Sequence, residues 1–374
     1  MRTDTIAEAV LAREDVARFL EGSAGAPSTV RRTKVMQYLE ELQTTQRYKL
    51  YRALEYPLIP ILRKIERHAE HQQLAVDAVK KGRVVYASNH RSHIDYLVEP
   101  LVLDDAGIRP PIIAAGINLF GGPLGLIHKH VTGALPIRRA TKDPAYLITL
   151  KAYVSELLHK HDIFFYPEGG RSYSGELKPM KSGLLNASID AQIPGLKLIP
   201  VAVSYDLVLE DHVIARQKVK RSQKAFSREI AELVRYAVGY RSRAFVTFGK
   251  PISLDGIDSE DKKAVLDVSR HVRREIGQLY KVLPTAVLAA AMTKSVTTAE
   301  LKSNIDGVLD TLRAANANLS VKTADEVLSV ATEPLITRNI IVVEQGRYRV
   351  RERNVLRYYA RSIAHLLSPP SSTH

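Results

Sequence analysis

The stretch RVVYASNHRSHIDYL at residues 83–97 decides the fold, because it passes from a β-branched apolar run through a polar turn into a helical pattern. Further apolar runs alternate with helical stretches along the chain. The runs lie at residues 111–114, 162–166, 198–203 and 244–248, and the clearest helical stretch lies at 144–160. Apolar strands that alternate with helices are typical of an α/β domain with a largely buried sheet. We therefore expect such a domain over residues 83–280.

Helical regions are expected on both sides of this domain. In residues 1–82, apolar residues recur at helical spacing. The predicted helices span 5–21, 30–54 and 57–81, with a connector rich in Gly, Pro and Ser at 22–28. Residues 281–374 contain a capping box at Thr297–Glu300, further helical stretches and a hairpin pattern at 340–350. Helices followed by a hairpin predict a separate, small C-terminal module that resembles a winged helix.

The composition narrows the functional classes. The 374 residues include no cysteine, which excludes a disulfide scaffold, a thiolate metal site and a cysteine nucleophile. Lysine and arginine outnumber aspartate and glutamate by 54 to 40, so the formal net charge is +14. Half of that excess lies in residues 212–243, with nine basic and two acidic side chains. A chain this basic is expected to meet nucleic acid, a phosphorylated metabolite or an anionic membrane surface.

No stretch of the sequence predicts a membrane-spanning helix. The apolar stretch at residues 283–292 has about half of the roughly 20 residues that a spanning helix needs. The first residues lead into a charged amphipathic pattern and lack the apolar core of a signal peptide. We therefore expect a cytoplasmic protein that is soluble or bound peripherally to a membrane.

The polar turn after the first strand of the expected domain carries a candidate catalytic pair, His90 and Asp95. Ligands of α/β sheets bind at the carboxyl ends of strands, and His90 directly follows such a strand. Residues five apart on one straight helix point about 140° away from each other. The pair therefore meets only if the turn folds His90 back, with Ser92 as the helix N-cap. Asp95 then accepts a hydrogen bond from one imidazole nitrogen, and the other nitrogen is free to take a proton from a hydroxyl group.

Three other interpretations of this turn stay open. Ser92 and Asp95 form a capping-box pattern, which needs no chemistry. His90, His93 and Asp95 could ligate a metal, although the spacing departs from the His-x-His-x-Asp-His pattern of metallo-β-lactamase-like sites. The two histidines are also compatible with a purely structural role.

A glycine-rich stretch, FYPEGGRSYSG at residues 165–175, is suited to bind an anion. Its glycines let backbone N–H groups approach a phosphate, and Arg171 offers a bidentate guanidinium. Glu168 can pair with Arg171 or position a substrate hydroxyl, and Lys178 and Lys181 add positive charge nearby. The alternative is a glycine-rich turn with a surface ion pair.

A second candidate for anion binding is GALPIRR at residues 133–139. It places Arg138 and Arg139 directly after an apolar run, where a phosphate could be bound. The alternative is a solvated pair of surface arginines.

Together and in this order, these stretches resemble the glycerol-3-phosphate acyltransferase group of the glycerolipid acyltransferase superfamily. The group's motifs are matched by NHRSHIDY at 89–96, GALPIRR at 133–139, EGGRS at 168–172 with Gly175, KPMKSG at 178–183 and IPVA at 199–202. The resemblance covers residues 83–255 well and the C-terminal segment more faintly. It implies an α/β fold with a mixed sheet flanked by helices, a helical N-terminal layer and a small C-terminal helical module.

The resemblance also implies roles for the site residues. His90 is the general base on the sn-1 hydroxyl of glycerol 3-phosphate, and Asp95 orients and charge-supports the imidazole. The implied acceptor-binding residues are Arg139, Glu168, Gly169, Arg171, Ser172 and Lys181. Pro200 lies near the acyl donor, which is acyl-CoA or acyl carrier protein. The reaction yields lysophosphatidic acid at the inner face of a membrane and uses no metal or other cofactor.

Alternative functions come from two different classes. The enzyme alternative is an acyltransferase for 1-acylglycerol 3-phosphate or dihydroxyacetone phosphate. The non-enzyme alternative is a basic winged-helix protein that binds nucleic acid through its C-terminal hairpin and residues 212–243. Residues 281–374 carry 12 basic against 8 acidic side chains and no sequence-reading motif, so nucleic acid is not the expected partner.

Overall fold

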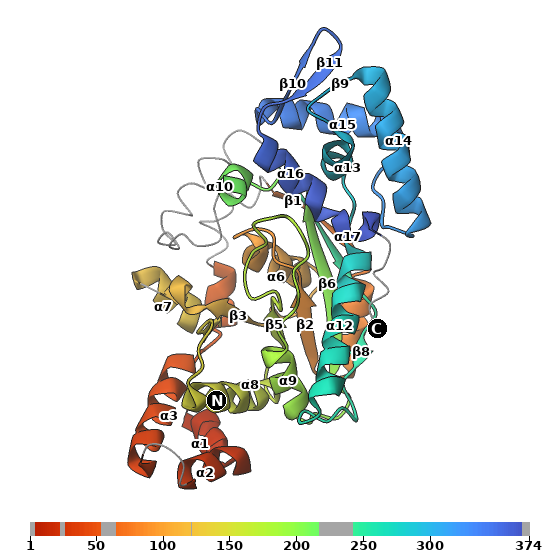
Figure 1. The fold of residues 1–374 in the computed structure, drawn as a ribbon. Coiled ribbons are helices and arrows are strands. Elements are labelled where there is room, and N and C mark those ends of the chain that lie inside the picture. Colours follow the sequence, from red (N-terminus) through yellow and green to blue (C-terminus); the bar gives the residue numbers. More distant parts are fainter. Residues whose placement is uncertain (1–3, 23–26, 54–64, 121, 217–241, 369–374) are drawn as a thin grey trace.

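The computed structural model describes residues 4–22, 27–53, 65–120, 122–216 and 242–368, and it is built around a mixed, mostly parallel sheet (Figure 1). The strands are β1 (Ile65–Glu70), β2 (Val84–Ser88), β3 (Ile112–Gly116), β4 (Leu135–Ile137), β5 (Ile163–Phe165), β6 (Lys197–Tyr205), β7 (Ser242–Phe248) and β8 (Ile252–Ser253). Their order is β1-β7-β6-β2-β5-β3-β4, with β8 paired to β6. β2 is parallel to both of its neighbours, whereas β7 runs antiparallel to β6. The predicted α/β fold is confirmed, and all five predicted strands are present.

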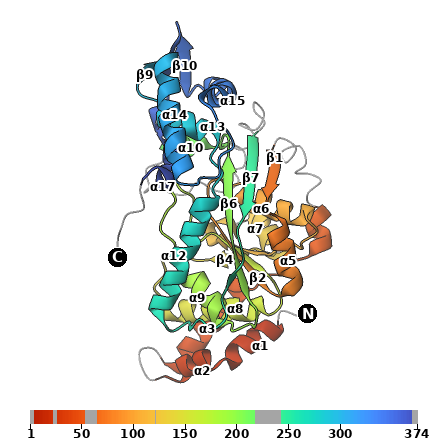
Figure 2. The same cartoon turned by 90° about the vertical axis from the view of Figure 1, so that its right-hand side faces the viewer.

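The sheet is buried on both faces, because successive side chains of its central strands point to opposite sides. Val84 and Tyr86 of β2 lie in one apolar core, whereas Val85 and Ala87 lie in the other. Helices α5 (Gln73–Lys81) and α6 (Asp95–Asp105) contribute to the first core. The second core is covered by α1 (Asp4–Ala12), α2 (Glu14–Glu21), α3 (Ser28–Leu42), α8 (Pro144–Leu158), α9 (Gly183–Asp190) and α12 (Lys262–Leu279). Figure 2 shows α12 and α5 on opposite sides of the sheet.

Shorter helices connect some of these elements. The 3-10 helix η1 (Ile117–Phe120) and helix α7 (Gly122–His130) lie between β3 and β4, and α10 (Asp211–Arg216) follows β6. None of the helices in the described part of the chain has the length and the apolar content that a bilayer-crossing helix requires.

The C-terminal residues form helices around a small antiparallel sheet, at the top of Figure 1. These elements are α13 (Pro284–Ala291), β9 (Ser295–Thr297), α14 (Thr298–Ala314), α15 (Ala324–Thr337), β10 (Ile341–Glu344), β11 (Arg347–Val350), α16 (Arg353–Ser362) and α17 (Ala364–Leu367). The predicted hairpin and the capping box at Thr297–Glu300 are both confirmed, and β9 pairs with β11. One apolar core continues from Tyr205 of the sheet to Leu301 of α14, so the domain boundary at residue 281 stays a prediction.

The helix expected over residues 57–81 is wrong within the described residues. Strand β1 occupies 65–70, and α5 begins only at Gln73. β1 is an edge strand that buries Ile65 and leaves charged side chains partly exposed. Charged edge strands are common because they discourage pairing with other chains. Because such strands contain few apolar residues, a search for apolar runs does not detect them.

The helix expected over residues 30–54 is also wrong in its extent. Helix α3 ends at Leu42, and residues 43–47 are not helical. The hydroxyl of Thr44 donates to the carbonyl oxygens of Lys129 and Ala134, each at 2.9 Å. These bonds tie the chain to the segment before β4 and are incompatible with a continuing helix.

Candidate active site

His90 and Asp95 form a hydrogen-bonded pair at the carboxyl end of β2. His90 follows the strand by two residues, and Asp95 is the first residue of α6. Nδ1 of His90 lies 2.8 Å from Oδ2 of Asp95. His90 lines a cavity, and its Nε2 atom has no hydrogen-bond partner among the described residues. The turn therefore folds His90 back onto Asp95, as the spacing required.

The carboxylate of Asp95 shapes the turn as well as orienting the ring. Its Oδ2 atom also accepts the backbone N–H groups of Arg91 at 2.6 Å and Ser92 at 3.0 Å. Its Oδ1 atom accepts the hydroxyl of Tyr205 at 2.7 Å. A carboxylate in the first turn stabilises a helix because it meets unpaired N–H groups and the positive end of the dipole. The expected N-cap at Ser92 is wrong, since α6 begins at Asp95 and the Ser92 hydroxyl donates to Glu210.

The surroundings of His90 favour a neutral imidazole. Burial lowers the pKa of His90, whose side chain is 14% exposed. The carboxylate of Asp95 raises that pKa, whereas Arg171 and His93 lower it. The net shift of the pKa is downward, so Nε2 carries a free lone pair at neutral pH when Nδ1–H donates to Asp95.

A buried layer of polar and aromatic side chains supports the ring of His90. Tyr166 stacks on it, with ring centroids 4.3 Å apart and 19° between the planes. The Tyr166 hydroxyl donates to Glu99 at 2.8 Å, and the Ser88 hydroxyl donates to the other oxygen of Glu99. Burial, with a contribution from Asp95, raises the pKa of Glu99 well above its usual range.

The cavity next to His90 measures about 540 Å³, and both cationic and apolar side chains line it. Arg139 and Lys181 lie there beside Gly169 and Gly170. The apolar lining residues include Ile113, Ile137, Leu147, Leu150, Phe165 and Leu184. A cavity lined by cationic and apolar side chains suits a ligand that has an anionic group and a hydrocarbon part.

Arg139 and Lys181 lie close to Gly170 and Gly169, respectively. A Cβ atom at Gly170 would lie 3.6 Å from Nη1 of Arg139. Gly169 has φ +68°, and a Cβ atom there would lie 2.7 Å from Nζ of Lys181. The positive φ favours glycine at residue 169, whereas a Cβ atom there would displace only the flexible end of Lys181. Among the described residues, no carboxylate forms an ion pair with either cation, so both are available to an anion.

Arg138 differs from its neighbour although it also lines the cavity. Its Nε atom donates to Glu41 at 2.7 Å, and Nη2 donates to the second oxygen of the same carboxylate. The guanidinium also lies over the ring of Tyr38, 5.0 Å from the centroid. Of the two arginines, Arg139 is therefore the one that no carboxylate of the described residues neutralises.

Glu168 and Ser172 do not line this cavity. The carboxylate of Glu168 accepts the N–H groups of His90 at 2.9 Å and Lys178 at 3.0 Å. The N–H group of Ser172 donates to the carbonyl oxygen of His90 at 3.0 Å. Both side chains are buried. These residues connect the glycine-rich loop to the catalytic turn (residues 89–95, which include the candidate pair). Their direct contact with an acceptor stays a prediction.

Arg171 lies behind the cavity wall as well. Its side chain is 8% exposed, and Nη1 is 3.5 Å from the carboxylate of Glu210. Its guanidinium also lies 5.7 Å from the ring centroid of Tyr173. Pro200 sits within β6 and does not line the cavity either. For both residues, the roles implied by the resemblance stay predictions.

The sequence patterns did not identify Glu99, Tyr205 and Glu210 as site residues. Glu99 carried a usable signal, because it is a lone acid in the apolar stretch YLVEPLVL, one helical turn after Asp95. Tyr205 and Glu210 carried none, since they are 110 and 118 residues away from their partners in the turn.

Two further predictions from the sequence concern metal binding at the turn and the basic segment at residues 212–243. In the described part of the chain, no group of three or more His, Cys, Asp or Glu side chains is arranged to hold a metal ion. Most of the basic segment at 212–243 lies outside the described residues, which omit 217–241.

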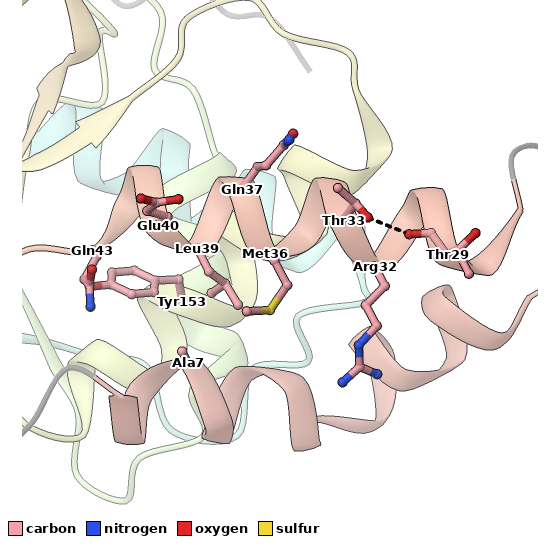
Figure 3. A pocket seen from close by; sticks show the side chains of 10 residues that line it. All are labelled: Ala7, Thr29, Arg32, Thr33, Met36, Gln37, Leu39, Glu40, Gln43 and Tyr153. Carbon is pink, nitrogen blue, oxygen red and sulfur yellow. Dashed lines mark hydrogen bonds between the residues drawn. The ribbon is translucent and has the colours of Figure 1, made fainter.

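A second cavity, of about 730 Å³, lies away from this site between α1, α3 and α8 (Figure 3). Ala7 of α1, Met36 of α3 and Tyr153 of α8 line it. It contains none of the predicted site residues. The chemistry inferred for the chain therefore concerns the cavity at His90.

Comparison with known proteins finds a family match over the part of the chain that carries the candidate site. Residues 64–204, which include all of the predicted catalytic and binding residues, match the family model described as Acyltransferase. The match confirms that the motifs resemble those of an acyltransferase family.

Curated relatives give the match a more particular name. The glycerol-3-phosphate acyltransferase of Aeromonas hydrophila is 29% identical over 382 residues, which cover 89% of this chain and 46% of the relative. The glycerol-3-phosphate acyltransferase of Actinobacillus succinogenes is 31% identical over 330 residues, which cover 79% of this chain and 40% of the relative. The chain thus spans about half the length of the curated relatives it matches. The 1-acyl-sn-glycerophosphate acyltransferase of Thermotoga maritima, a solved structure, has a TM-score of 0.36 and 13% identity, over 74% of this chain and 96% of that one.

Proposed function

We propose that the chain transfers a fatty acyl group from a thioester to the sn-1 hydroxyl of glycerol 3-phosphate and so forms lysophosphatidic acid. The observation that carries this proposal is the pair His90 and Asp95, 2.8 Å apart, beside a cavity lined by cationic and apolar side chains. The relatives named glycerol-3-phosphate acyltransferase support the choice of acceptor.

His90 acts as the general base in this proposal. The proton of the acceptor hydroxyl passes to Nε2 of His90 while the hydroxyl oxygen bonds to the thioester carbonyl carbon. The carboxylate of Asp95 stabilises the resulting imidazolium through Nδ1–H. The carbon–sulfur bond then breaks, and the proton passes from Nε2 to the leaving thiolate. The substrate hydroxyl is the nucleophile, so no covalent acyl-enzyme forms.

Arg139 and Lys181 bind the phosphate of the acceptor. Both line the cavity of His90, and neither is neutralised by a carboxylate of the described residues. A phosphate with two negative charges gains most from cations of this kind, because hydrogen bonds between charged groups are stronger than neutral ones. Gly169 and Gly170 have no side chains, so Arg139 and Lys181 can lie close to the backbone of the glycine-rich loop.

The apolar lining residues of the cavity receive the acyl chain of the donor, which is acyl-CoA or acyl carrier protein. Leu147 and Leu150 of α8 and Phe165 of β5 are among them. Burial of a hydrocarbon chain there brings the thioester to His90 and keeps water from the reacting carbon.

We place the chain at the inner face of an anionic membrane. The donor chain and the product are amphiphilic, and the net charge of +14 is attracted to anionic headgroups. Flotation with anionic liposomes at low and high salt checks this placement. Binding that is lost at high salt is expected, and the absence of binding at low salt would contradict the placement.

An acceptor panel tests the proposed function. The purified chain is incubated with one labelled acyl donor and, separately, glycerol 3-phosphate, 1-acylglycerol 3-phosphate or dihydroxyacetone phosphate. We expect glycerol 3-phosphate to be acylated fastest, and His90→Ala to abolish that product. Faster acylation of another acceptor would support the enzyme alternative. Duplex binding at moderate salt without any acyl transfer would support the nucleic-acid alternative.

A further inference from the structure

Glu210 connects two parts of the candidate active site. Its side chain is buried, 5% exposed, a short distance beyond the end of β6. Each of its carboxylate oxygens lies 2.8 Å from the hydroxyl of Ser92, and Oε1 accepts the N–H group of His93 at 2.7 Å. Oε1 also lies 3.5 Å from Nη1 of Arg171. One buried carboxylate thus contacts both the catalytic turn and the glycine-rich loop.

The contacts of Glu210 complement those of Asp95. Ser92 and His93 lie between the two catalytic residues in the sequence. Asp95 holds the N–H group of Ser92, whereas Glu210 holds the hydroxyl of Ser92 and the N–H group of His93. The turn is therefore fixed by two carboxylates that contact different groups. A buried carboxylate is costly unless donors of this kind surround it, so its interactions resist displacement.

The segment that carries Glu210 is hydrogen-bonded to the C-terminal helices through Asp211, the residue after Glu210. Asp211 is fully buried and accepts the hydroxyl of Tyr359 in α16 at 2.7 Å. It also accepts the guanidinium of Arg338, which follows α15. The Tyr359 hydroxyl in turn accepts the N–H group of Val208 at 2.9 Å.

A third C-terminal helix contacts the same segment. The hydroxyl of Thr285 in α13 donates to the carbonyl oxygen of Asp206 at 2.7 Å. Arg338 also donates to the carbonyl oxygen of Leu209 at 3.1 Å. Residues 206–211 are therefore held between the sheet and the helices α13, α15 and α16 by buried hydrogen bonds.

We infer that Glu210 is a positioning residue for the catalytic turn, and that the C-terminal helices hold it in place through Asp211. The inference rests on the acyl transfer proposed above. It gives residues 281–374 a role in catalysis although none of the described residues from 281 to 368 lines the cavity of His90. Glu210 does not line that cavity either, and it acts through Ser92, His93 and Arg171.

Loss of the Glu210 carboxylate has a predictable direction. The hydrogen bond between His90 and Asp95 raises the pKa of His90. A loosened turn weakens this bond and therefore lowers the pKa. Arg171, which lowers that pKa, also loses its contact with the negative charge of Glu210. Both effects move the pKa of His90 downward, so the acidic limb of the activity profile moves to lower pH. A misaligned base also lowers kcat.

Four variants test the inference. Glu210→Ala removes every acceptor and is expected to lower kcat by at least about 10-fold, because small displacements of catalytic groups are costly. Glu210→Gln keeps one accepting oxygen and is expected to restore part of kcat. Tyr359→Phe removes the hydroxyl that holds Asp211 and is expected to change kcat and the acidic limb in the same direction, by less. The control is Thr323→Ala, described next.

Thr323→Ala destabilises the same C-terminal helices without touching residues 206–211. Thr323 is exposed, and its hydroxyl caps α15 by accepting the N–H group of Glu326. Its loss is expected to lower the thermal midpoint and to leave kcat, KM and the acidic limb unchanged. If Glu210→Gln and Tyr359→Phe behave like this control, the positioning role is overturned, whether or not Glu210→Ala folds.

A measurement without substrate separates this inference from the proposed function. The His90 ring is titrated by NMR in the wild-type chain, Glu210→Gln and Tyr359→Phe, with His90→Ala identifying the signal. A lower pKa of His90 in both variants supports the positioning role even if the wild-type chain fails to acylate glycerol 3-phosphate. An unchanged titration in both variants overturns the positioning role and leaves the proposed function standing.

Discussion

The ring of Tyr166 lies nearly parallel to the ring of His90, with centroids 4.3 Å apart and 19° between the planes. The Asp95 carboxylate binds the same imidazole at Nδ1. The imidazole is thus restrained on one face by an aromatic ring and at one edge by a carboxylate. The Tyr166 hydroxyl points to Glu99, 2.8 Å away, so the tyrosine itself is held in place.

Two substitutions of Tyr166 distinguish the contribution of its ring to kcat from that of its hydroxyl. Tyr166→Phe keeps the stacked ring, and we expect kcat to stay within about 3-fold of wild type. Tyr166→Ala removes the stack, which is worth about 0.5–1.5 kcal/mol, and we expect kcat to fall by up to about 10-fold. Steady-state kinetics on samples of matched folded fraction checks both values. An equal loss in the two variants would assign the effect to the hydroxyl and Glu99 instead.

Substitution of the catalytic pair distinguishes a chemical role from a structural one. His90→Ala is expected to lower kcat by at least about 10²-fold, the lower end for a general base. The thermal midpoint should change little, because His90 faces the cavity. Asp95→Asn is expected to lower kcat as severely. It should also lower the thermal midpoint, because the carboxylate accepts the N–H groups of Arg91 and Ser92. Near-normal kcat in His90→Ala would contradict the mechanism.

Adjacent arginines provide a matched test of the acceptor site. Arg139→Ala removes a cation without a carboxylate partner and is expected to raise KM for glycerol 3-phosphate by about 10- to 100-fold, as for a charged hydrogen bond of about 1.5–3 kcal/mol. Arg138→Ala removes a cation that Glu41 already neutralises, so KM should change by less than about 3-fold. Equal effects of the two variants, or a changed acyl-chain preference with a normal KM, would contradict the assignment of Arg139.

The central strands could be predicted from the sequence because burial on both faces makes them continuous apolar runs. Strand β6, with Ile199, Val201 and Val203 on one face and Leu198 and Ala202 on the other, is an example. The edge strand β1 buries one residue firmly and exposes charged ones, so the same search missed it.

The contact between His90 and Asp95 could be predicted because the two residues are close in sequence and one turn brings them together. The contacts of that turn with Tyr205 and Glu210 could not be predicted, because these residues lie at and beyond the carboxyl end of β6, more than 100 residues later in the sequence. Residue type alone also left Arg138 and Arg139 equivalent. Their difference depends on Glu41, which is 97 residues away from Arg138.

The activity of the chain is expected to persist below the usual pKa of histidine. The general base must be neutral, and burial lowers the pKa of His90 below its ordinary value of 6.5. The acidic limb of kcat/KM should therefore lie below pH 6.5. Asp95 opposes this shift, so Asp95→Asn should move the limb of its residual activity to still lower pH. A limb above pH 6.5 in the wild-type chain would contradict a buried neutral base.

A different histidine is expected to control stability at low pH. Burial lowers the pKa of His365 to about 4, and the nearby Arg91 and Arg273 contribute to the decrease. Its Nε2 atom lies 3.0 Å from the carbonyl oxygen of Gly277, and its Nδ1 atom is buried without a hydrogen-bond partner. The side chain also packs edge-on against the ring of Tyr280, with centroids 5.9 Å apart.

Substitution of His365 tests this expectation. The unfolded chain binds the proton near pH 6.5, whereas the folded chain resists it until about pH 4. The contribution of His365 to the free energy of unfolding is therefore complete above pH 6.5 and declines as the pH falls toward about 4. His365→Leu should flatten this decline and should cost about 1 kcal/mol at neutral pH, because the bond to Gly277 is lost. Denaturant unfolding at several pH values measures both effects. His271→Leu, at a side chain that is 43% exposed on α12, serves as the control and should keep the wild-type slope. If His365→Leu also keeps that slope, another group must bind the proton, and the buried neutral state of His365 is refuted.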